Sequence, residues 1–200
     1  MRASFLNVFE LGLLMKHIFL GAAALILSTA VGAETYIGGA LGFSEIEANC
    51  DFTTSCDKSD TGFKIYGGYV LPRSPLPNLA LEVGYTDFGQ AHARTTSLVD
   101  RTVSVTALTF GAAMRLKFTP ELNGVGRLGL AYVEGKDNGI GVFGLGAKSN
   151  SDMNMYVGLG LEYALNKQWK LTGSADFTSY DTGNQSGSAR LMSIGAQYGY

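Results

Sequence analysis

Eight segments of this chain alternate, at a period of two, between a row of mostly apolar residues and a row of other residues. Successive side chains of a β-strand point to opposite faces of the sheet, so each segment predicts a strand with one apolar face. The apolar rows lie at residues 37–43, 63–71, 79–85, 108–118, 128–132, 155–163, 169–177 and 192–200. The pattern therefore predicts an all-β fold.

The row opposite the apolar one carries the charges of these segments and is otherwise mostly Gly, Ala, Ser and Thr. Its charged members are Lys64, Glu82, Arg115, Lys117, Arg127, Glu162, Lys170 and Asp176. Small residues with charges of both signs fit the interior of a narrow barrel. A Lys or Arg facing lipid would cost about 2–4 kcal/mol at the midplane. We therefore expect an eight-stranded antiparallel up-and-down transmembrane β-barrel, with these charges forming a network in its lumen.

The connections between the segments alternate in length. Short ones lie at 72–78, 119–122 and 166–168, and the four prolines fall in two of them. Long ones lie at 44–60, 88–101, 134–152 and 179–190. Short periplasmic turns and long extracellular loops are expected of an outer-membrane barrel. Apolar residues in the third long connection suggest that its flanking strands extend as a hairpin; a further transmembrane hairpin, giving ten strands, is the alternative.

The N-terminus reads as an export signal. Lys16 and His17 precede an apolar run over 18–27, and Val31-Gly32-Ala33 resembles a cleavage site. We expect a signal peptide over residues 1–33, with Met15 as an alternative start, and a barrel domain over 34–200. A retained membrane anchor is the alternative. Export of a barrel predicts the outer membrane of a Gram-negative cell, and a net charge of −2 gives no indication of nucleic acid as a partner.

The two cysteines, Cys50 and Cys56, lie in the first long connection. In an exported chain such a close pair predicts a disulfide bond. Metal binding together with the nearby Asp51, Asp57 and Asp60 is the alternative, but two cysteines alone do not make a zinc site.

The last segment places apolar and aromatic residues on one row: Met192, Ile194, Ala196, Tyr198 and Tyr200. We expect this strand to lie at the closing seam of the barrel. Aromatic residues recur near strand ends and predict interfacial girdles, with ordinary β-propensity as the alternative. They are Tyr36, Phe43, Tyr85, Phe118, Tyr132, Trp169, Tyr198 and Tyr200.

The stretches YIGGALGFS, YGGYVLP with LALEVGYTDFG, TPELNGVGRLGL, GLGLEYALNKQWKL and SIGAQYGY follow one another across the chain. In this order they resemble the OmpA-like eight-stranded outer-membrane β-barrel family. The resemblance implies that the terminal strand is the signal read by the outer-membrane assembly machinery. It also implies a lumen network in which Glu82, Glu162 and Arg127 match family positions. Ala113 and Ser174 stand where bases are expected, and Arg115 can substitute for the first.

Two further groups of residues suggest functional sites. His92 lies near Asp87 and Ser97, which suggests a rim enzyme, although a solvated loop histidine is the simpler interpretation. The first long connection holds acids that suggest calcium binding, although a solvated acidic loop is again simpler. They are Glu45, Glu47, Asp51, Asp57 and Asp60. We expect no catalytic residue, no metal and no cofactor.

These observations favour a non-enzymatic integral outer-membrane protein that serves envelope structure or surface interaction through four extracellular loops. The alternatives are a narrow channel for ions or small solutes and, less favoured, a rim enzyme acting on lipid A or protein. The expected partners are outer-membrane lipid, lipopolysaccharide, the assembly machinery and an extracellular ligand at the loops. We expect a monomer.

Overall fold

The computed structural model of this chain describes residues 34–47, 55–76, 78–95, 99–140, 148–181 and 186–199. The chain divides into two units, residues 1–34 and 35–200, and every strand belongs to the second. The predicted signal peptide lies outside the described residues, as do Cys50 and Tyr200. The described residues include no helix of the length and apolarity needed to cross a membrane.

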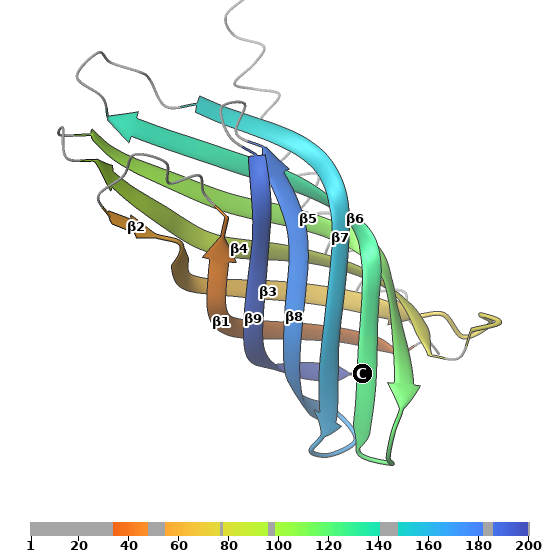
Figure 1. The fold of residues 1–200 in the computed structure, drawn as a ribbon. Helices are drawn as coiled ribbons and strands as arrows, with labels where there is room; N and C mark the ends of the chain where they lie inside the picture. Colours follow the sequence, from red (N-terminus) through yellow and green to blue (C-terminus); the bar gives the residue numbers. More distant parts are fainter. Residues whose placement is uncertain are drawn as a thin grey trace, which may run out of the picture. The chain divides into compact units, whose positions relative to one another are not determined.

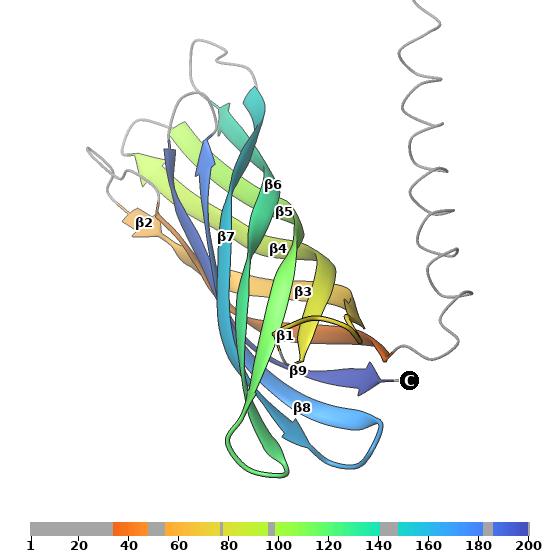
Figure 2. The same cartoon turned by 90° about the vertical axis from the view of Figure 1, so that its right-hand side faces the viewer.

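In the described part of the chain, nine strands make one antiparallel sheet that closes on itself (Figures 1 and 2). They are β1 (Thr35–Ile46), β2 (Ser55–Asp57), β3 (Ser59–Val70), β4 (Leu79–Thr95), β5 (Val99–Lys117), β6 (Leu122–Ile140), β7 (Lys148–Ala164), β8 (Trp169–Asp181) and β9 (Ser186–Gly199). Each strand of the barrel wall pairs with its neighbours in chain order, β3 following β1, and β9 pairs with β1 to close the barrel. The short β2 pairs only with the outer end of β4. The eight-stranded barrel and the closing position of the terminal strand are confirmed.

The apolar row faces outward around the barrel. Phe43 is 80% exposed and Ile194 is 70% exposed, as expected of side chains that meet lipid rather than a protein core. The aromatic girdle prediction is wrong for Tyr36, which is buried inside the barrel. Its position falls on the inward row, one residue from the outward Ile37, so the strand period overrides the preference of a tyrosine for the interface.

Two of the three short connections, those between β5 and β6 and between β7 and β8, are tight turns held by local hydrogen bonds. The Thr119 hydroxyl accepts the backbone N–H groups of Glu121 and Leu122 at 3.3 and 3.0 Å. The Asn166 side chain accepts those of Gln168 and Trp169, both at 2.8 Å. Such side-chain acceptors satisfy amides that the strand ladder leaves free.

The four long connections differ from the prediction, because much of each is strand rather than loop. The β4–β5 ladder continues to Thr95↔Val99, and the β6–β7 ladder continues to Asp137↔Lys148. The expected extended hairpin is therefore present between β6 and β7. Its unbroken ladder is inconsistent with a further transmembrane hairpin.

Two ladders of the wall stop early on the side of the long connections. The β3–β4 ladder ends at Phe63↔Asp87, below a bulge between Asp87 and Gln90 that contains Gly89 at φ 71°. The β7–β8 ladder ends at Tyr156↔Thr178. Between these two seams, β4, β5, β6 and β7 run on together as an extended sheet (Figure 1).

Candidate functional site

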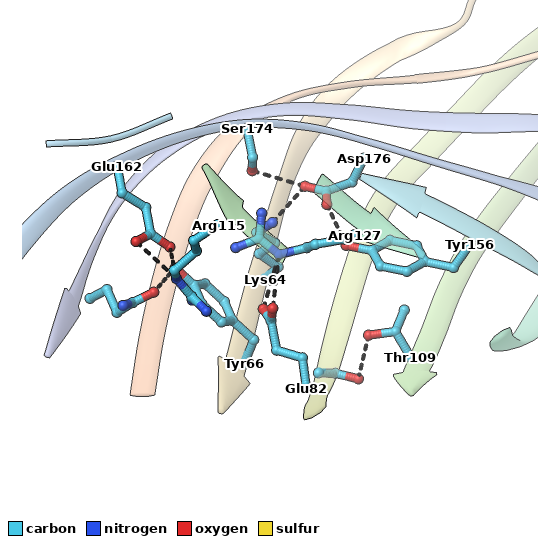
Figure 3. A network of polar contacts seen from close by, with 12 residues as sticks. Lys64, Tyr66, Glu82, Thr109, Arg115, Arg127, Tyr156, Glu162, Ser174 and Asp176 are labelled. Carbon is cyan, nitrogen blue, oxygen red and sulfur yellow. Dashed lines mark hydrogen bonds and ion pairs between the residues drawn. The ribbon is translucent and has the colours of Figure 1, made fainter. Parts of the chain in front are cut away.

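Ion pairs cross the lumen between strands that are not neighbours (Figure 3). Lys64 of β3 contacts Asp176 of β8, with Nζ and Oδ2 2.6 Å apart. Arg127 of β6 donates from Nε to both carboxylate oxygens of Glu82 of β4, at 3.0 and 3.1 Å. Because each of these pairs joins strands that do not pair with each other, the network ties the barrel wall together through its interior.

A third pair lies beside them. Arg115 of β5 donates from Nε to both oxygens of Glu162 of β7, at 3.0 and 3.1 Å, and Lys170 contacts the same carboxylate at 3.1 Å. Glu162 is one of the carboxylates that match family positions. Arg115 binds it, as suggested for a base that stands in for the one expected at Ala113. Charges of both signs that are withdrawn from water need such partners.

Asp176 is the most heavily used acceptor of the network, and its side chain is fully buried. Besides Lys64, it accepts hydrogen bonds from the hydroxyl of Tyr156 and from Ser174 Oγ, the latter at 2.9 Å. Ser174 and Ser193 lie 3.1 Å apart at their hydroxyl oxygens. Ser174, where the family pattern expects a base, therefore supports a carboxylate.

Aromatic rings fill the space around the bases. The guanidinium carbon of Arg115 lies 4.3 Å from the ring centre of Tyr36, and that of Arg127 lies 5.2 Å from the ring centre of Tyr66. Tyr36 and Tyr66 meet edge to face with their centres 6.4 Å apart. Cations over ring faces gain electrostatic attraction, more so where water is excluded.

Of the eight predicted network residues, the structure brings seven into ion pairs. The exception is Lys117, which is exposed at the end of β5 next to a short turn. It shares the inward parity of Arg115, but its strand ends there and the side chain meets solvent. Lys170 lies at the edge of the charge network, with 28% of its side chain exposed.

Little free space remains among the paired residues. The cavity there has a volume of about 20 Å³ and is lined by Lys64, Tyr66, Glu82, Thr109, Arg127 and Tyr156, among others. That volume holds about one water molecule. At this depth the lumen is packed with side chains.

A second, apolar layer fills the lumen toward the long connections, and we call it the apolar plug. Its buried members are Ile46, Phe88, Ala91, Val103, Val105, Ala107, Ala131, Val133, Tyr156, Tyr180, Ala189 and Leu191. Tyr156 belongs to both layers, since its ring packs in the plug while its hydroxyl binds Asp176.

The polarity of the wall inverts where the plug begins. On β5, Leu108 and Phe110 point outward and Thr109 points inward, whereas farther along Val103 and Val105 are the buried, inward residues. Below this level the sheet is apolar outside and polar inside. Above it, the sheet is apolar inside and polar outside, as in a water-soluble protein. The inversion indicates where the wall leaves the membrane.

The sequence reasoning missed the plug and the lumen tyrosines. The sequence does carry a signal for the plug: Val105 shares the inward parity of Arg115 on its strand, and Val133 shares that of Arg127. Five of the twelve plug residues lie in the long connections predicted as loops. The other seven lie on the row opposite the apolar one or between a predicted strand and a long connection.

The outer end of the closing seam is fastened by Glu47 next to β1. Its backbone N–H donates to the carbonyl of Ser188 at 2.9 Å, and its carbonyl accepts the Tyr180 hydroxyl at 2.6 Å. Ser188 Oγ donates to its carboxylate at 2.7 Å, and Arg190 lies 3.3 Å away. The Ser188 hydrogen bond, together with attraction from Arg190, holds the pKa of Glu47 below its ordinary value.

The other candidates do not assemble into a site in the described part of the chain. Nδ1 of His92 lies 3.2 Å from the Thr102 hydroxyl, while Asp87 accepts the Gly89 amide at 2.8 Å. Asp60 accepts two backbone amides, and no described group of three or more His, Cys, Asp or Glu is placed to hold a metal ion. The predicted disulfide stays a prediction, because Cys50 lies outside the described residues.

A closed antiparallel barrel with an apolar outer row and a charged, packed lumen defines an outer-membrane β-barrel protein. Residues 18–200 match the family described as the outer membrane protein beta-barrel domain, and the chain belongs to this family. Its location is accordingly the cell outer membrane, with the apolar row facing lipid.

Solved structures with the same fold include three small barrels. Ail, the attachment invasion locus protein of Yersinia pestis, is 17% identical with a TM-score of 0.56, over 84% of this chain and 99% of its own. Neisserial surface protein A is 14% identical with a TM-score of 0.57, over 82% and 96%. OprG of Pseudomonas aeruginosa is 15% identical with a TM-score of 0.54, over 84% and 96%. At these identities the likeness concerns the fold alone. No curated protein matches the sequence.

Proposed function

We propose that this protein is a sealed, non-enzymatic barrel whose function is carried by the surface that it holds outside the membrane. The observation that carries this proposal is the filling of the lumen by two layers in series, the charge network and the apolar plug. A side-chain-filled interior is also what the narrow width of eight strands favours.

The two layers oppose permeation for different reasons. An ion entering the charge network would have to separate bases from carboxylates that are bound at 2.6–3.1 Å. An ion entering the apolar plug would lose hydration to side chains that are mainly hydrocarbon, which is strongly unfavourable. The narrow channel is therefore the less favoured function.

The outer rim is the part of the barrel with room for specific contacts. The extended sheet of β4 to β7 gives it a rigid platform, and loops on a rigid scaffold commonly carry recognition. Acidic side chains outnumber basic ones among the described rim residues. The acids are Glu45, Glu47, Asp57, Asp60, Asp87, Asp100, Glu134, Asp137, Asp152 and Asp181, and the bases are Lys58, Arg94, Arg101, Lys136, Lys148 and Arg190.

This charge balance bears on the kind of partner. Ail has been solved in complex with the heparin analogue sucrose octasulfate, which is a polyanion. An acidic rim repels polyanions, so we do not extend that ligand to this chain. A neutral or cationic partner fits the rim better.

Conductance tests the sealed lumen. The purified barrel, and separately the Glu82→Gln/Glu162→Gln variant, is added to a planar lipid bilayer, with a trimeric porin as the positive control. We expect the wild type to give no discrete current steps. Steps from the wild type whose size or ion selectivity changes in the variant would show that the lumen conducts and would overturn the proposal.

The non-enzymatic part is tested separately. The purified barrel is incubated with lipid A and with an unfolded protein substrate, and the products are analysed by mass spectrometry. We expect neither substrate to change. An activity that His92→Ala abolishes, in a variant that still folds, would instead establish a rim enzyme.

A further inference from the structure

The outer part of β7 has a strand partner on one side only. Residues from Lys148 to Met155 pair with β6, but the ladder with β8 stops at Tyr156↔Thr178. β8 continues to Asp181 in a ladder with β9, while β7 curves away beyond it (Figure 1). Among the described strands, none pairs with the outer edge of β7.

The direction of the backbone groups on this edge follows from one hydrogen bond. The carbonyl of Met155 accepts Thr178 Oγ1 at 3.1 Å, so it points toward β8 and away from β6. Backbone groups alternate in direction along a strand, so those of Met153 and Ser151 point the same way. An edge of N–H and C=O groups in this arrangement is a template for another strand.

A groove lies beside this edge. Its volume is about 550 Å³, and its lining includes Asp152, Asn154, Ser179, Tyr180, Asp181 and Ser186. Binding pockets commonly measure about 300–1,000 Å³. At its foot, Ser179 Oγ donates to Asn154 Oδ1 at 3.1 Å. Nδ2 of Asn154 is buried and has no hydrogen-bond partner in the described part of the chain.

The charges of the groove select among possible occupants. Asp152 and Asp181 stand on its two sides, one from β7 and one from β8. A second copy of this chain would bring the same two acids to the same edge, and like charges disfavour that pairing. The anionic headgroups of outer-membrane lipid are disfavoured for the same reason. A basic segment is complementary.

We propose that the outer edge of β7 binds a basic, extended peptide segment of another protein as an added β-strand. The backbone of the segment pairs with Ser151 and Met153, and its Lys or Arg side chains meet Asp152 and Asp181. Strand addition draws affinity from main-chain hydrogen bonds and specificity from alternate side chains. This inference rests on the proposed role of the outer rim in surface contact, and it names the chemistry of the partner.

The test uses the whole barrel in lipid nanodiscs and three synthetic ten-residue peptides. The first alternates Lys with Val and Thr, the second has Glu in place of Lys, and the third is the first with an N-methylated backbone. Binding is followed by fluorescence anisotropy, and amide exchange is followed at Ser151 and Met153. We expect the first peptide alone to bind and to slow exchange at those two amides.

Two variants and a matched control locate the site. Asp152→Asn/Asp181→Asn weakens binding of the basic peptide by about tenfold, because it removes both charges. Ser151→Pro blocks the edge, and its lost N–H points away from β6, so the ladder that holds β7 in place is kept. Asp57→Asn, which changes an exposed rim acid away from the groove, leaves binding unchanged.

The outcomes separate this inference from the proposed function. Equal binding of the N-methylated peptide, or equal loss with Asp57→Asn, would mean general attraction to an acidic rim and would overturn the edge site. Cross-linking of the barrel to itself through β7 would overturn it in favour of a second copy. A barrel that is silent in bilayers but binds no peptide would overturn the edge site alone, whereas a conducting barrel would overturn the proposed function.

Discussion

The aromatic ring of Tyr66 on β3 lies directly over Gly38, its cross-strand partner on β1. Past that glycine, the Tyr66 hydroxyl reaches Gln197 Oε1 on β9 at 3.4 Å. Gly38 pairs with both Tyr66 and Gln197, so one side chain covers three strands at the seam where the barrel closes. Tyr36 lies over Gly68 in the same way, two pairs farther along the same ladder. These rings shield backbone that glycine leaves bare.

Gly38→Ala should weaken the closing seam. A Cβ at this position would overlap the ring of Tyr66, so the ring would have to leave its place and its contact with Gln197. We expect a loss of about 1–3 kcal/mol in the free energy of unfolding, as for other overpacked interiors. Urea unfolding in lipid vesicles, read by the gel shift between folded and unfolded barrel, measures it.

The control for this substitution is Gly173→Ala. A Cβ at position 173 meets no atom within 4 Å, so its effect should be small. If both variants unfold at the same urea concentration, the cost is that of losing a glycine, and the contact between Tyr66 and Gly38 has no special role.

Asp176→Asn should destabilise the barrel more than a surface change would. It leaves the ammonium of Lys64, whose side chain is only 6% exposed, without its carboxylate. Removing one partner of a buried pair costs roughly 3–5 kcal/mol. The same unfolding measurement applies, and the double variant Lys64→Met/Asp176→Asn completes the comparison.

The double variant should recover much of the lost stability, because it removes the unpaired charge as well as the pair. A double variant that is as unstable as the sum of its parts would mean that Lys64 and Asp176 act independently. Asp176 would then matter mainly as the acceptor for Tyr156 and Ser174.

The fold could be read from the sequence because one simple rule holds across the membrane. Lys64 and Ile65 are adjacent, yet one is buried in the lumen and the other faces lipid, and a period of two separates them. The same parity selected the residues of the charge network. It did not select their partners: Lys64 and Asp176 are 112 residues apart, and only the closure of the barrel brings them together.

The rule failed where the wall leaves the membrane. Val103 and Val133 are inward and buried, whereas the outward residues next to them on the strands include Thr102, Ser104 and Glu134, since water replaces lipid outside. Here the apolar residues face inward and the polar residues face outward. Mixed with glycines and charged residues, this alternation resembles the sequence of a loop. The sequence therefore predicts loops for the long connections and does not reveal the apolar plug.

Asp60→Ala should loosen the seam between β3 and β4. The Asp60 carboxylate accepts the backbone N–H of Thr61 and that of Gln90 across the bulge, both at 2.7 Å. It replaces ladder hydrogen bonds where the pairing of the two strands ends. We expect the Gln90 amide to lose about 1 kcal/mol of protection, measured by hydrogen exchange. Asp57→Ala is the control, and equal loss at Gln90 in both would exclude a local role for Asp60.

Ile194→Arg tests the outward row directly. Ile194 is 70% exposed and pairs with Leu41 and Gly173 in the central part of the wall, where the outward surface meets lipid. An arginine on that surface near the midplane should cost about 2–4 kcal/mol, because its charge is withdrawn from water without a partner. Ile194→Leu, which keeps the side chain apolar, should unfold like the wild type in lipid vesicles. An arginine variant as stable as the leucine variant would mean that this depth of the wall is wet, and the membrane boundary placed by the polarity inversion would have to move below it.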